Sequence, residues 1–192
     1  MRKPFVQLII FKYFPTVGDI VVGVIMLKSA ENFRVDIGSP TLANLSNIAF
    51  NSATKRHRPN FKVGQVVLCH VVGAHKFLDV EVSCEDPSSQ KDWVTNEVYF
   101  GALPEGGLLV QLPVRLGRSL AEQGSEMFNL IGQYLKPFEL ATGMNGRIYI
   151  KTAEGDNLRA VLIAKILEQI NASMSLSDLE NLCQEMQGRL QN

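Results

Sequence analysis

Five short segments rich in β-branched residues follow one another between residues 18 and 86, and turn signals separate them. They read GDIVVGVIML, NFRVDIG, LANLSNIAF, GQVVLCHVVGA and LDVEVSCED. Apolar and polar residues alternate in the second and fifth segments, which is typical of half-buried strands. The alternation predicts two inward-facing sets: Phe33, Val35 and Ile37, and Leu78, Val80 and Val82. Five such strands match a small closed barrel, and the OB-fold is the five-stranded case.

A polar stretch, PSSQKDWVT at residues 87–95, breaks this pattern and is predicted to be a linker. We therefore place an all-β OB-fold domain at residues 15–87 and a second domain at residues 96–192. Trp93 is the single tryptophan of the chain. We expect it to be buried at the domain junction, with an anchor for a protein partner as the alternative.

The second domain mixes strands and helices. GGLLVQLP predicts a strand, VRLGRSLAEQ and SEMFNLIGQYL predict helices, and FELATGMNGRIYIK predicts two strands. Asn145-Gly146 lies between those two strands, and such a pair is a strong hairpin signal, with positive φ expected at both residues. A helix follows at LRAVLIAKILEQI. The order strand, helix, helix, strand, strand, helix is typical of an α+β domain with its helices on one face of a sheet.

Charge is unevenly distributed although the formal net charge is zero. The segment ATKRHRPN lies between two predicted strands and places Lys55, Arg56 and Arg58 on one loop that contains no acid. Such a loop can bind phosphates, with Arg binding bidentately and Lys acting as a point charge. A solvated turn that only aids solubility is the alternative.

Further cations border the face on which OB-folds hold oligonucleotides, namely the second and third strands and two adjoining loops. Lys28 precedes the predicted hairpin, Arg34 points outward from its strand, and Lys76 lies with His75 in a later loop. Phe33 shares its side with core residues, so no stacking aromatic is expected. The predicted contact is therefore mainly with phosphates, and its sequence preference is low.

No pattern indicates catalysis. The three histidines show no metal-ligand spacing, the three cysteines show neither a disulfide framework nor a paired metal motif, and there is no P-loop or GxSxG. We expect no catalytic residue, no metal and no cofactor. No apolar run approaches the ~18 residues of a membrane span.

Gly143-Met144-Asn145-Gly146 matches the GxxG spacing with which KH domains clamp nucleic-acid backbone. A clamping loop joins two helices, whereas this one lies between two predicted strands. A structural role in the hairpin is therefore favoured over RNA clamping.

Taken together, YFPTVGDIVVGVI, FRVDIG, ATKRHRPN and FELATGMNGRIYIK resemble, in this order, the RNA exosome cap subunits called ribosomal-RNA-processing protein forty. The resemblance spans roughly residues 13–170. It implies an S-one type OB-fold followed by a KH domain, in a subunit that is not an enzyme. The implied partners are RNase PH-like ring subunits, other cap subunits and single-stranded RNA, which moves towards a separate nuclease for 3'-5' processing and degradation in rRNA processing and mRNA turnover. The implied location is the nucleus and nucleolus, and also the cytoplasm. The resemblance further implies that GxNG is a structural element at the domain junction.

The sequence departs from this pattern at two places. Arg34 and Asn44 stand where the general S-one pattern has an exposed aromatic and a histidine, which weakens the case for base stacking. Residues 1–14 are expected to be a remnant of the family's N-terminal domain. The sister cap subunit, processing protein four, and a free-standing RNA-binding protein are the alternatives.

Overall fold

The computed structural model describes residues 13–86, 99–123, 125–153, 156–170 and 174–191, so the predicted linker and Trp93 lie outside the described residues. The strands are β1 (Ile20–Lys28), β2 (Asn32–Asp36), β3 (Ala43–Phe50), β4 (Val66–Gly73), β5 (Glu81–Cys84), β6 (Gly101–Ala102), β7 (Leu108–Gln111), β8 (Phe138–Thr142) and β9 (Arg147–Thr152). The helices are α1 (Val114–Gln123), α2 (Ser125–Leu135), α3 (Asn157–Gln169) and α4 (Leu176–Gln191).

Within the described chain, β1 to β5 close a five-stranded barrel, as predicted. The strand order is β1-β2-β3-β5-β4, and β4 returns to pair with β1. β3 and β5 run parallel, and the other pairs in this ring are antiparallel. The short strand β6 falls inside the predicted second domain, yet it pairs with β4 of the barrel.

The barrel interior is filled by the side chains that alternation places inside. Phe33, Val35 and Ile37 are fully buried, as predicted, and Val80 and Val82 are also buried. Leu78 was predicted to join them, but its side chain is 69% exposed. The reason is that β5 begins only at Glu81, so Leu78 belongs to the loop before the strand, where side chains need not alternate.

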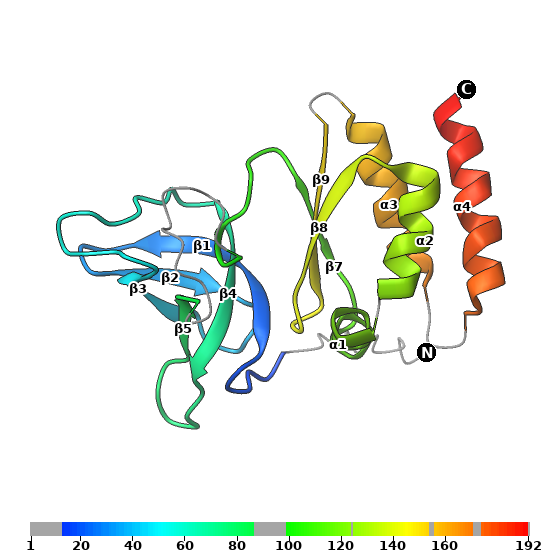
Figure 1. Cartoon of the computed structure of the whole chain (residues 1–192). Coiled ribbons are helices and arrows are strands. Elements are labelled where there is room, and N and C mark those ends of the chain that lie inside the picture. The colour runs from blue at the N-terminus through cyan, green and yellow to red at the C-terminus, as the bar shows by residue number, and fades with distance from the viewer. Residues whose placement is uncertain (1–12, 87–98, 124, 154–155, 171–173, 192) are drawn as a thin grey trace, which may run out of the picture.

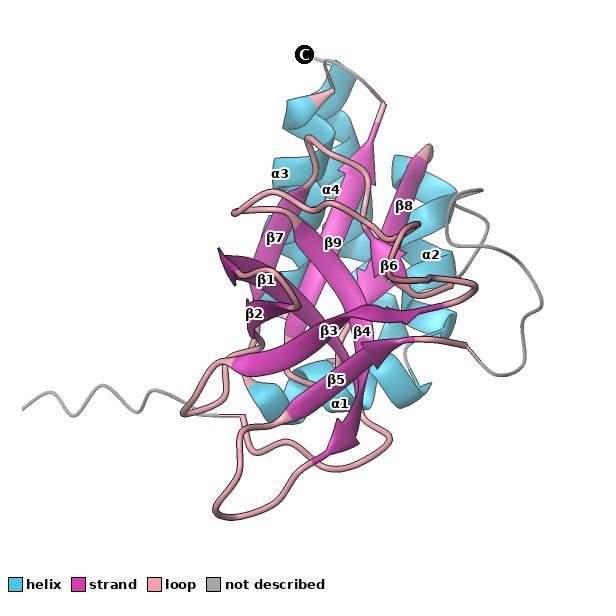
Figure 2. Cartoon of the chain, turned by 90° about the vertical axis from the view of Figure 1, so that its left-hand side faces the viewer, coloured by secondary structure: helices cyan, strands magenta, loops and turns pink. Residues whose placement is uncertain are grey.

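The mixed α/β region that follows the barrel, for which we keep the name second domain, has the predicted element order, β7-α1-α2-β8-β9-α3, followed by α4. Its antiparallel sheet has the order β7-β9-β8. Figures 1 and 2 show the barrel on one side of this sheet and α2, α3 and α4 on the other. The chain is therefore an OB-type barrel followed by a mixed α/β region of the predicted α+β kind.

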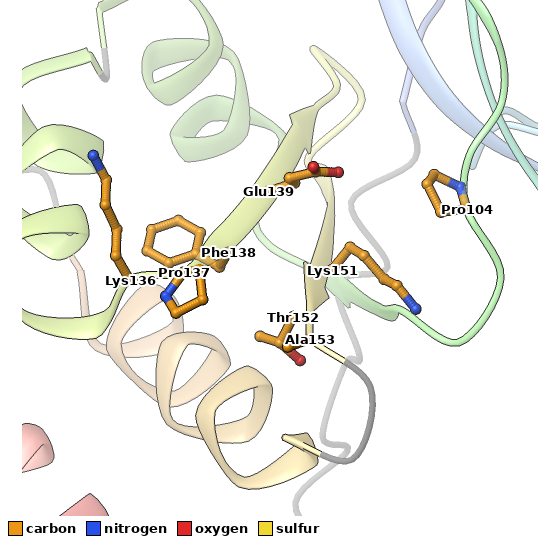
Figure 3. A pocket seen from close by; sticks show the side chains of 8 residues that line it. All are labelled: Pro104, Lys136, Pro137, Phe138, Glu139, Lys151, Thr152 and Ala153. Carbon is orange, nitrogen blue, oxygen red and sulfur yellow. The ribbon is translucent and has the colours of Figure 1, made fainter. Parts of the chain in front are cut away.

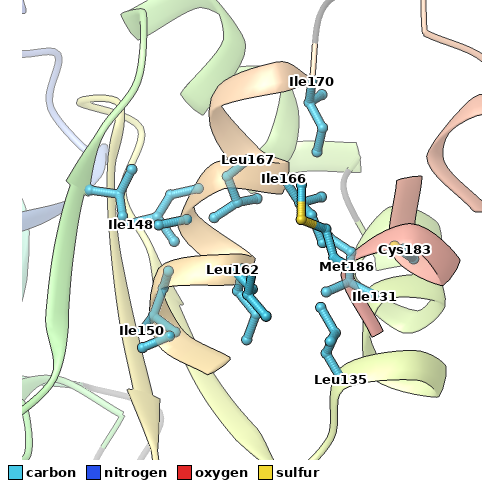
Figure 4. Packing of buried hydrophobic residues seen from close by; sticks show 14 of the residues in the cluster. Ile131, Leu135, Ile148, Ile150, Leu162, Ile166, Leu167, Ile170, Cys183 and Met186 are labelled. Atoms are coloured by element: carbon cyan, nitrogen blue, oxygen red, sulfur yellow. The ribbon is translucent and has the colours of Figure 1, made fainter. Parts of the chain in front are cut away.

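The core of the second domain forms where the helices cover the sheet. β9 presents Ile148 and Ile150 to α3, whose Leu162 and Ile166 pack in turn against α2 and α4 (Figure 4). These four side chains are at most 3% exposed. Burying a side chain of this kind stabilises a fold by roughly 1.5–3 kcal/mol, so the region has a core of its own.

The β8–β9 hairpin lies where Asn145-Gly146 predicted it, but its geometry differs. Gly146 has a φ of +81°, but the φ of Asn145 is not positive. The Gly146 N–H donates to the Gly143 carbonyl at 3.0 Å, and the Gly143 N–H donates to the Arg147 carbonyl at 2.8 Å. This is the pattern of a three-residue loop that ends in a left-handed glycine. The prediction of positive φ at both residues was wrong because the loop is one residue longer than the two-residue turn, and one left-handed residue then suffices.

Replacing Gly146 with valine should destabilise the protein by at least about 2 kcal/mol. A Cβ at this position would lie 2.5 Å from the Leu112 carbonyl oxygen, in addition to the strain of its positive φ. Gly64→Val is the matched control, because Gly64 also has positive φ but no atom within 4 Å of the added Cβ. Thermal unfolding should show the larger loss for Gly146→Val. Equal losses in the two variants would mean that close packing at Gly146 contributes nothing.

Candidate nucleic-acid interface

The outer face of β2 and β3 is a half-exposed polar surface, which we call the strand face. It consists of Asn32, Arg34, Asn44 and Ser46, and Arg34 lies directly opposite Asn44 in the antiparallel register. These residues alternate with the buried core residues of the same strands. Amide, hydroxyl and guanidinium groups therefore line the surface that OB-folds use for oligonucleotides.

The loop between β3 and β4 carries the densest group of cations; we call residues 53–60 the basic loop. Lys55, Arg56 and Arg58 are exposed, and within the described chain none of the three has a hydrogen bond or an ion pair. The loop is closed by the Thr54 N–H, which donates to the His57 carbonyl at 2.8 Å. Buried Pro59 fixes its far end. Three cations thus project into solvent from an ordered turn, as phosphate binding requires.

Lys28 joins this group across space. It ends β1, and its ammonium donates a hydrogen bond to the Asn60 side-chain carbonyl at the end of the basic loop. An amide oxygen leaves the positive charge of Lys28 uncompensated. The predicted residues Lys28, Lys55, Arg56 and Arg58 are therefore brought together at one end of the strand face.

The other end of the strand face is bordered by the β4–β5 loop, residues 74–80. Because β3 and β5 run parallel, β5 starts beside Asn44 and ends beside Phe50, so the basic loop and the β4–β5 loop lie at opposite ends of these strands (Figure 2). Lys76 is exposed in the second of these loops. Arg34 lies opposite Asn44, which is beside the start of β5, so it belongs to the same end of the strand face as Lys76. The six predicted RNA-binding residues consequently lie towards the two ends of one face.

Arg34 has a protein partner, which the sequence did not indicate. Its guanidinium lies 2.6 Å from the Asp79 carboxylate, and the two side chains are 41% and 50% exposed. A pair this exposed contributes little to stability. It does attach the β4–β5 loop to the strand face, and it leaves Arg34 less available to a phosphate than the cations of the basic loop.

The β4–β5 loop also exposes an aromatic side chain that sequence reasoning missed. Phe77 is 89% exposed. No stacking aromatic was expected, because Phe33 shares its side of the strand with core residues. The signal for Phe77 is the run His75-Lys76-Phe77-Leu78, which begins two residues after Gly73 and breaks the alternation of a strand.

The GMNG hairpin contacts the barrel directly. The Asn145 side chain, 1% exposed, donates to the Val22 and Ile37 carbonyls at 2.8 and 2.9 Å and accepts from the Val22 N–H at 3.3 Å. The Met144 N–H donates to the Ile20 carbonyl at 2.8 Å. All of these partners belong to or follow the barrel strands β1 and β2. The hairpin is thus attached to the backbone of the barrel through Met144 and Asn145.

Two ion pairs also join the domains. Arg147 lies 2.7 Å from Asp36, and Arg118 of α1 lies 2.8 Å from buried Asp19. Burial acts to raise the pKa of Asp36, but the hydrogen bonds from Arg147 and the Gly38 N–H outweigh it and hold the pKa below its usual value. The contribution of this pair to stability is therefore present above the pKa of the unfolded carboxyl and is lost as pH falls through the lowered pKa of the folded state.

A separate pocket of about 520 Å³ lies in the second domain (Figure 3). It is lined by Pro104, Lys136, Pro137, Phe138, Glu139, Lys151, Thr152 and Ala153, none of which belongs to the strand face or its loops. The Lys151 ammonium donates to the Glu105 carbonyl at 2.6 Å. Among the described residues, no cluster of three or more His, Cys, Asp or Glu side chains could hold a metal ion. None of the described helices combines the length and the apolar character needed to cross a membrane.

Comparison with known proteins matches this geometry to a family. The profile described as "Exosome complex component RRP40, S1 domain" matches residues 13–94, which include the whole barrel. The exosome complex component rrp40 of Schizosaccharomyces pombe is 32% identical over 171 residues, which cover 89% of this chain and 67% of that relative. The chain belongs to the RRP40 family.

Other relatives agree with the RRP40 assignment. The exosome complex component RRP40 of Bos taurus is 35% identical over 157 residues, 82% of this chain and 54% of that protein. The chain thus spans about half the length of several curated RRP40 relatives that it matches. A crystal structure of a protein provisionally described as an exosome complex RNA-binding protein superposes with a TM-score of 0.69 at 21% identity, covering 94% of this chain and 99% of that one. At 21% identity this likeness supports only the fold of the chain.

Proposed function

We propose that this chain is a non-catalytic, RNA-binding cap subunit of an RNA exosome. One observation carries the proposal: Lys55, Arg56 and Arg58 project together from the barrel without protein partners in the described chain. Unpaired cations on an ordered loop are suited to phosphates, and the polar strand face beside them suits a single strand. Because the chain belongs to the RRP40 family, we propose that it binds RNA as part of the exosome complex.

In this proposal RNA crosses the strand face between the basic loop and the β4–β5 loop. Lys28, Lys55, Arg56 and Arg58 hold phosphates at one end, and Lys76 does so at the other. Arg34, at the same end as Lys76, contacts the strand only after exchanging Asp79 for a phosphate. Because phosphates carry no sequence information, the subunit guides many RNAs alike.

The partners in the proposal are RNase PH-like ring subunits and the other cap subunits of the exosome, and the strand is delivered to a separate nuclease for 3'-5' processing. We further propose that the subunit acts in rRNA processing and mRNA turnover, and that it is located in the nucleus, the nucleolus and the cytoplasm. GMNG acts as a junction element in this proposal. The Asn145 side chain donates hydrogen bonds to the Val22 and Ile37 carbonyls, which supports a structural role of the motif over RNA clamping. A free-standing RNA-binding protein is the alternative function, and co-purification separates the two.

Purified protein should bind single-stranded RNA without degrading it in the presence of magnesium and phosphate. The tagged chain, isolated from its native source, should bring with it a stable set of RNase PH-like subunits. RNA cleavage that survives repurification and disappears with a point substitution in this chain would contradict the non-catalytic assignment. Isolation without any such partners would favour the free-standing alternative.

A further inference from the structure

The β4–β5 loop holds Phe77 away from every protein core. Its side chain is 89% exposed, the highest value among the exposed large apolar side chains of the described residues. Single exposed apolar residues are common on protein surfaces, so exposure alone assigns no role. The groups around the ring indicate whether it can bind a ligand.

A cation lies over one face of the ring and leaves the other face open to a ligand. The Lys76 ammonium is 5.6 Å from the centroid of Phe77, within the range of a cation–π contact. Asp79, the acid of this loop, is engaged by Arg34 at 2.6 Å. The loop therefore offers a flat apolar surface and an ammonium group that no carboxylate neutralises within the described chain.

One hydrogen bond within the loop and one ion pair to β2 order it. The Leu78 N–H donates to the His75 carbonyl at 3.3 Å, which closes a turn around Lys76 and Phe77. The Arg34–Asp79 pair fixes the end of the loop to β2, at the border of the strand face. A ring positioned before its ligand arrives loses less entropy on binding than a mobile one.

We infer that Phe77 is a stacking platform for an unpaired nucleobase and that Lys76 contacts a neighbouring phosphate of the same strand. This inference rests on the proposed function. The cores of protein–protein interfaces are depleted of charge, whereas Phe77 is bordered by Lys76, the Arg34–Asp79 pair and the polar strand face. Every base has a π-face, so the contact tolerates any sequence but requires a single strand. The subunit therefore reads more than phosphates, and it discriminates against paired RNA.

Two probes separate base from backbone: a short oligouridylate, and an abasic oligomer of the same length that keeps every ribose and phosphate. Phe77→Ala in the full chain should weaken binding of the oligouridylate by about fivefold to a hundredfold, from the typical free energy of one base stack. It should leave binding of the abasic oligomer unchanged. Fluorescence of a 2-aminopurine base in the strand should be quenched by the wild-type protein and not by Phe77→Ala.

Conservative variants test whether the ring itself matters. Phe77→Tyr should bind like wild type, and Phe77→Leu should bind like Phe77→Ala, because leucine is apolar but has no π-face. Leu78→Ala, an exposed apolar truncation at the next position, should change nothing. Wild-type affinity in Phe77→Leu, or equal weakening of both oligomers in Phe77→Ala, would overturn the inference.

The outcomes also distinguish this inference from the function it rests on. If the wild-type chain binds neither oligomer, the proposed function fails and the stacking site fails with it. If binding depends on the basic loop but every Phe77 variant binds like wild type, RNA binding stands and the stacking site is wrong. An assembly defect in Phe77→Ala with unchanged RNA binding would identify Phe77 as a protein contact instead, and would also overturn the inference.

Discussion

Asn145→Asp is expected to lower the free energy of unfolding by at least about 3 kcal/mol. The Asn145 amide group donates to two carbonyls of the barrel, at 2.8 and 2.9 Å, from a position that is 1% exposed. A carboxylate cannot donate, so both carbonyls would lose their partner and face a buried negative charge. Chemical denaturation of the full chain measures the loss.

Asn181→Asp is the matched control for this substitution. It makes the same chemical change at an exposed position of α4, where the effect should stay within about 0.5 kcal/mol. If the two variants unfold alike, the Asn145 side chain does not hold the barrel to the second domain.

Asn145→Asp should also loosen the contact between the barrel and the second domain before it unfolds either of them. The Met144–Ile20 hydrogen bond and both ion pairs across the junction lie near Asn145 or on the same elements. Loss of the Asn145 bonds should therefore raise amide hydrogen exchange at Val22 and along β1 more than in the α3 core. Uniformly raised exchange would indicate global destabilisation instead.

Most of the fold follows from the sequence because local signals agree with one another. Alternation in NFRVDIG placed Phe33, Val35 and Ile37 in the barrel core, and the hairpin signal at Asn145-Gly146 placed β8 and β9. Alternation failed at Leu78 because the periodicity of a sequence continues beyond the residue at which a strand begins. Strand ends are set by pairing partners, here β3 and β4, which are distant in the sequence.

The contacts between elements could not be predicted for the same reason. Asn145 meets Val22 across 123 positions of the chain, and Arg34 meets Asp79 across 45. No local pattern reports such pairs. The residue pattern by itself therefore presents Arg34 as a free cation and Asn145 as a turn residue, and only the family resemblance implied that GxNG lies at the domain junction. Phe77 was not predicted because the alternation of strand residues says nothing about a side chain that the fold exposes in a loop.

The largest effect on RNA binding is expected from replacing Lys55, Arg56 and Arg58 together with alanine. Each phosphate contact with single-stranded nucleic acid contributes about 0.7 to the slope of log K against log salt concentration. Three lost contacts reduce the slope by about 2 and weaken binding about a hundredfold at 0.1 M salt. The loss should be similar for different RNA sequences. Folding should barely change, because exposed charges without ion pairs contribute little to stability.

Lys62→Ala together with Lys165→Ala and Arg189→Ala is the matched control. Like the first triple variant, it removes three exposed cations, but from outside the basic loop. Lys62 lies in the same β3–β4 connection, two residues past the basic loop, so the control also tests whether position within this connection matters. A general loss of positive charge would weaken both triple variants equally, whereas a phosphate site on the basic loop weakens mainly the first.

Whether the barrel holds RNA by its basic loop is best measured by the dependence of RNA affinity on salt concentration, compared between the wild-type chain and the Lys55, Arg56 and Arg58 triple variant. The slope should be shallower by about 2 in the variant, with an unchanged melting temperature and the same loss on unrelated RNA sequences. An identical slope and affinity in the two proteins would contradict the claim that this barrel holds RNA by its basic loop.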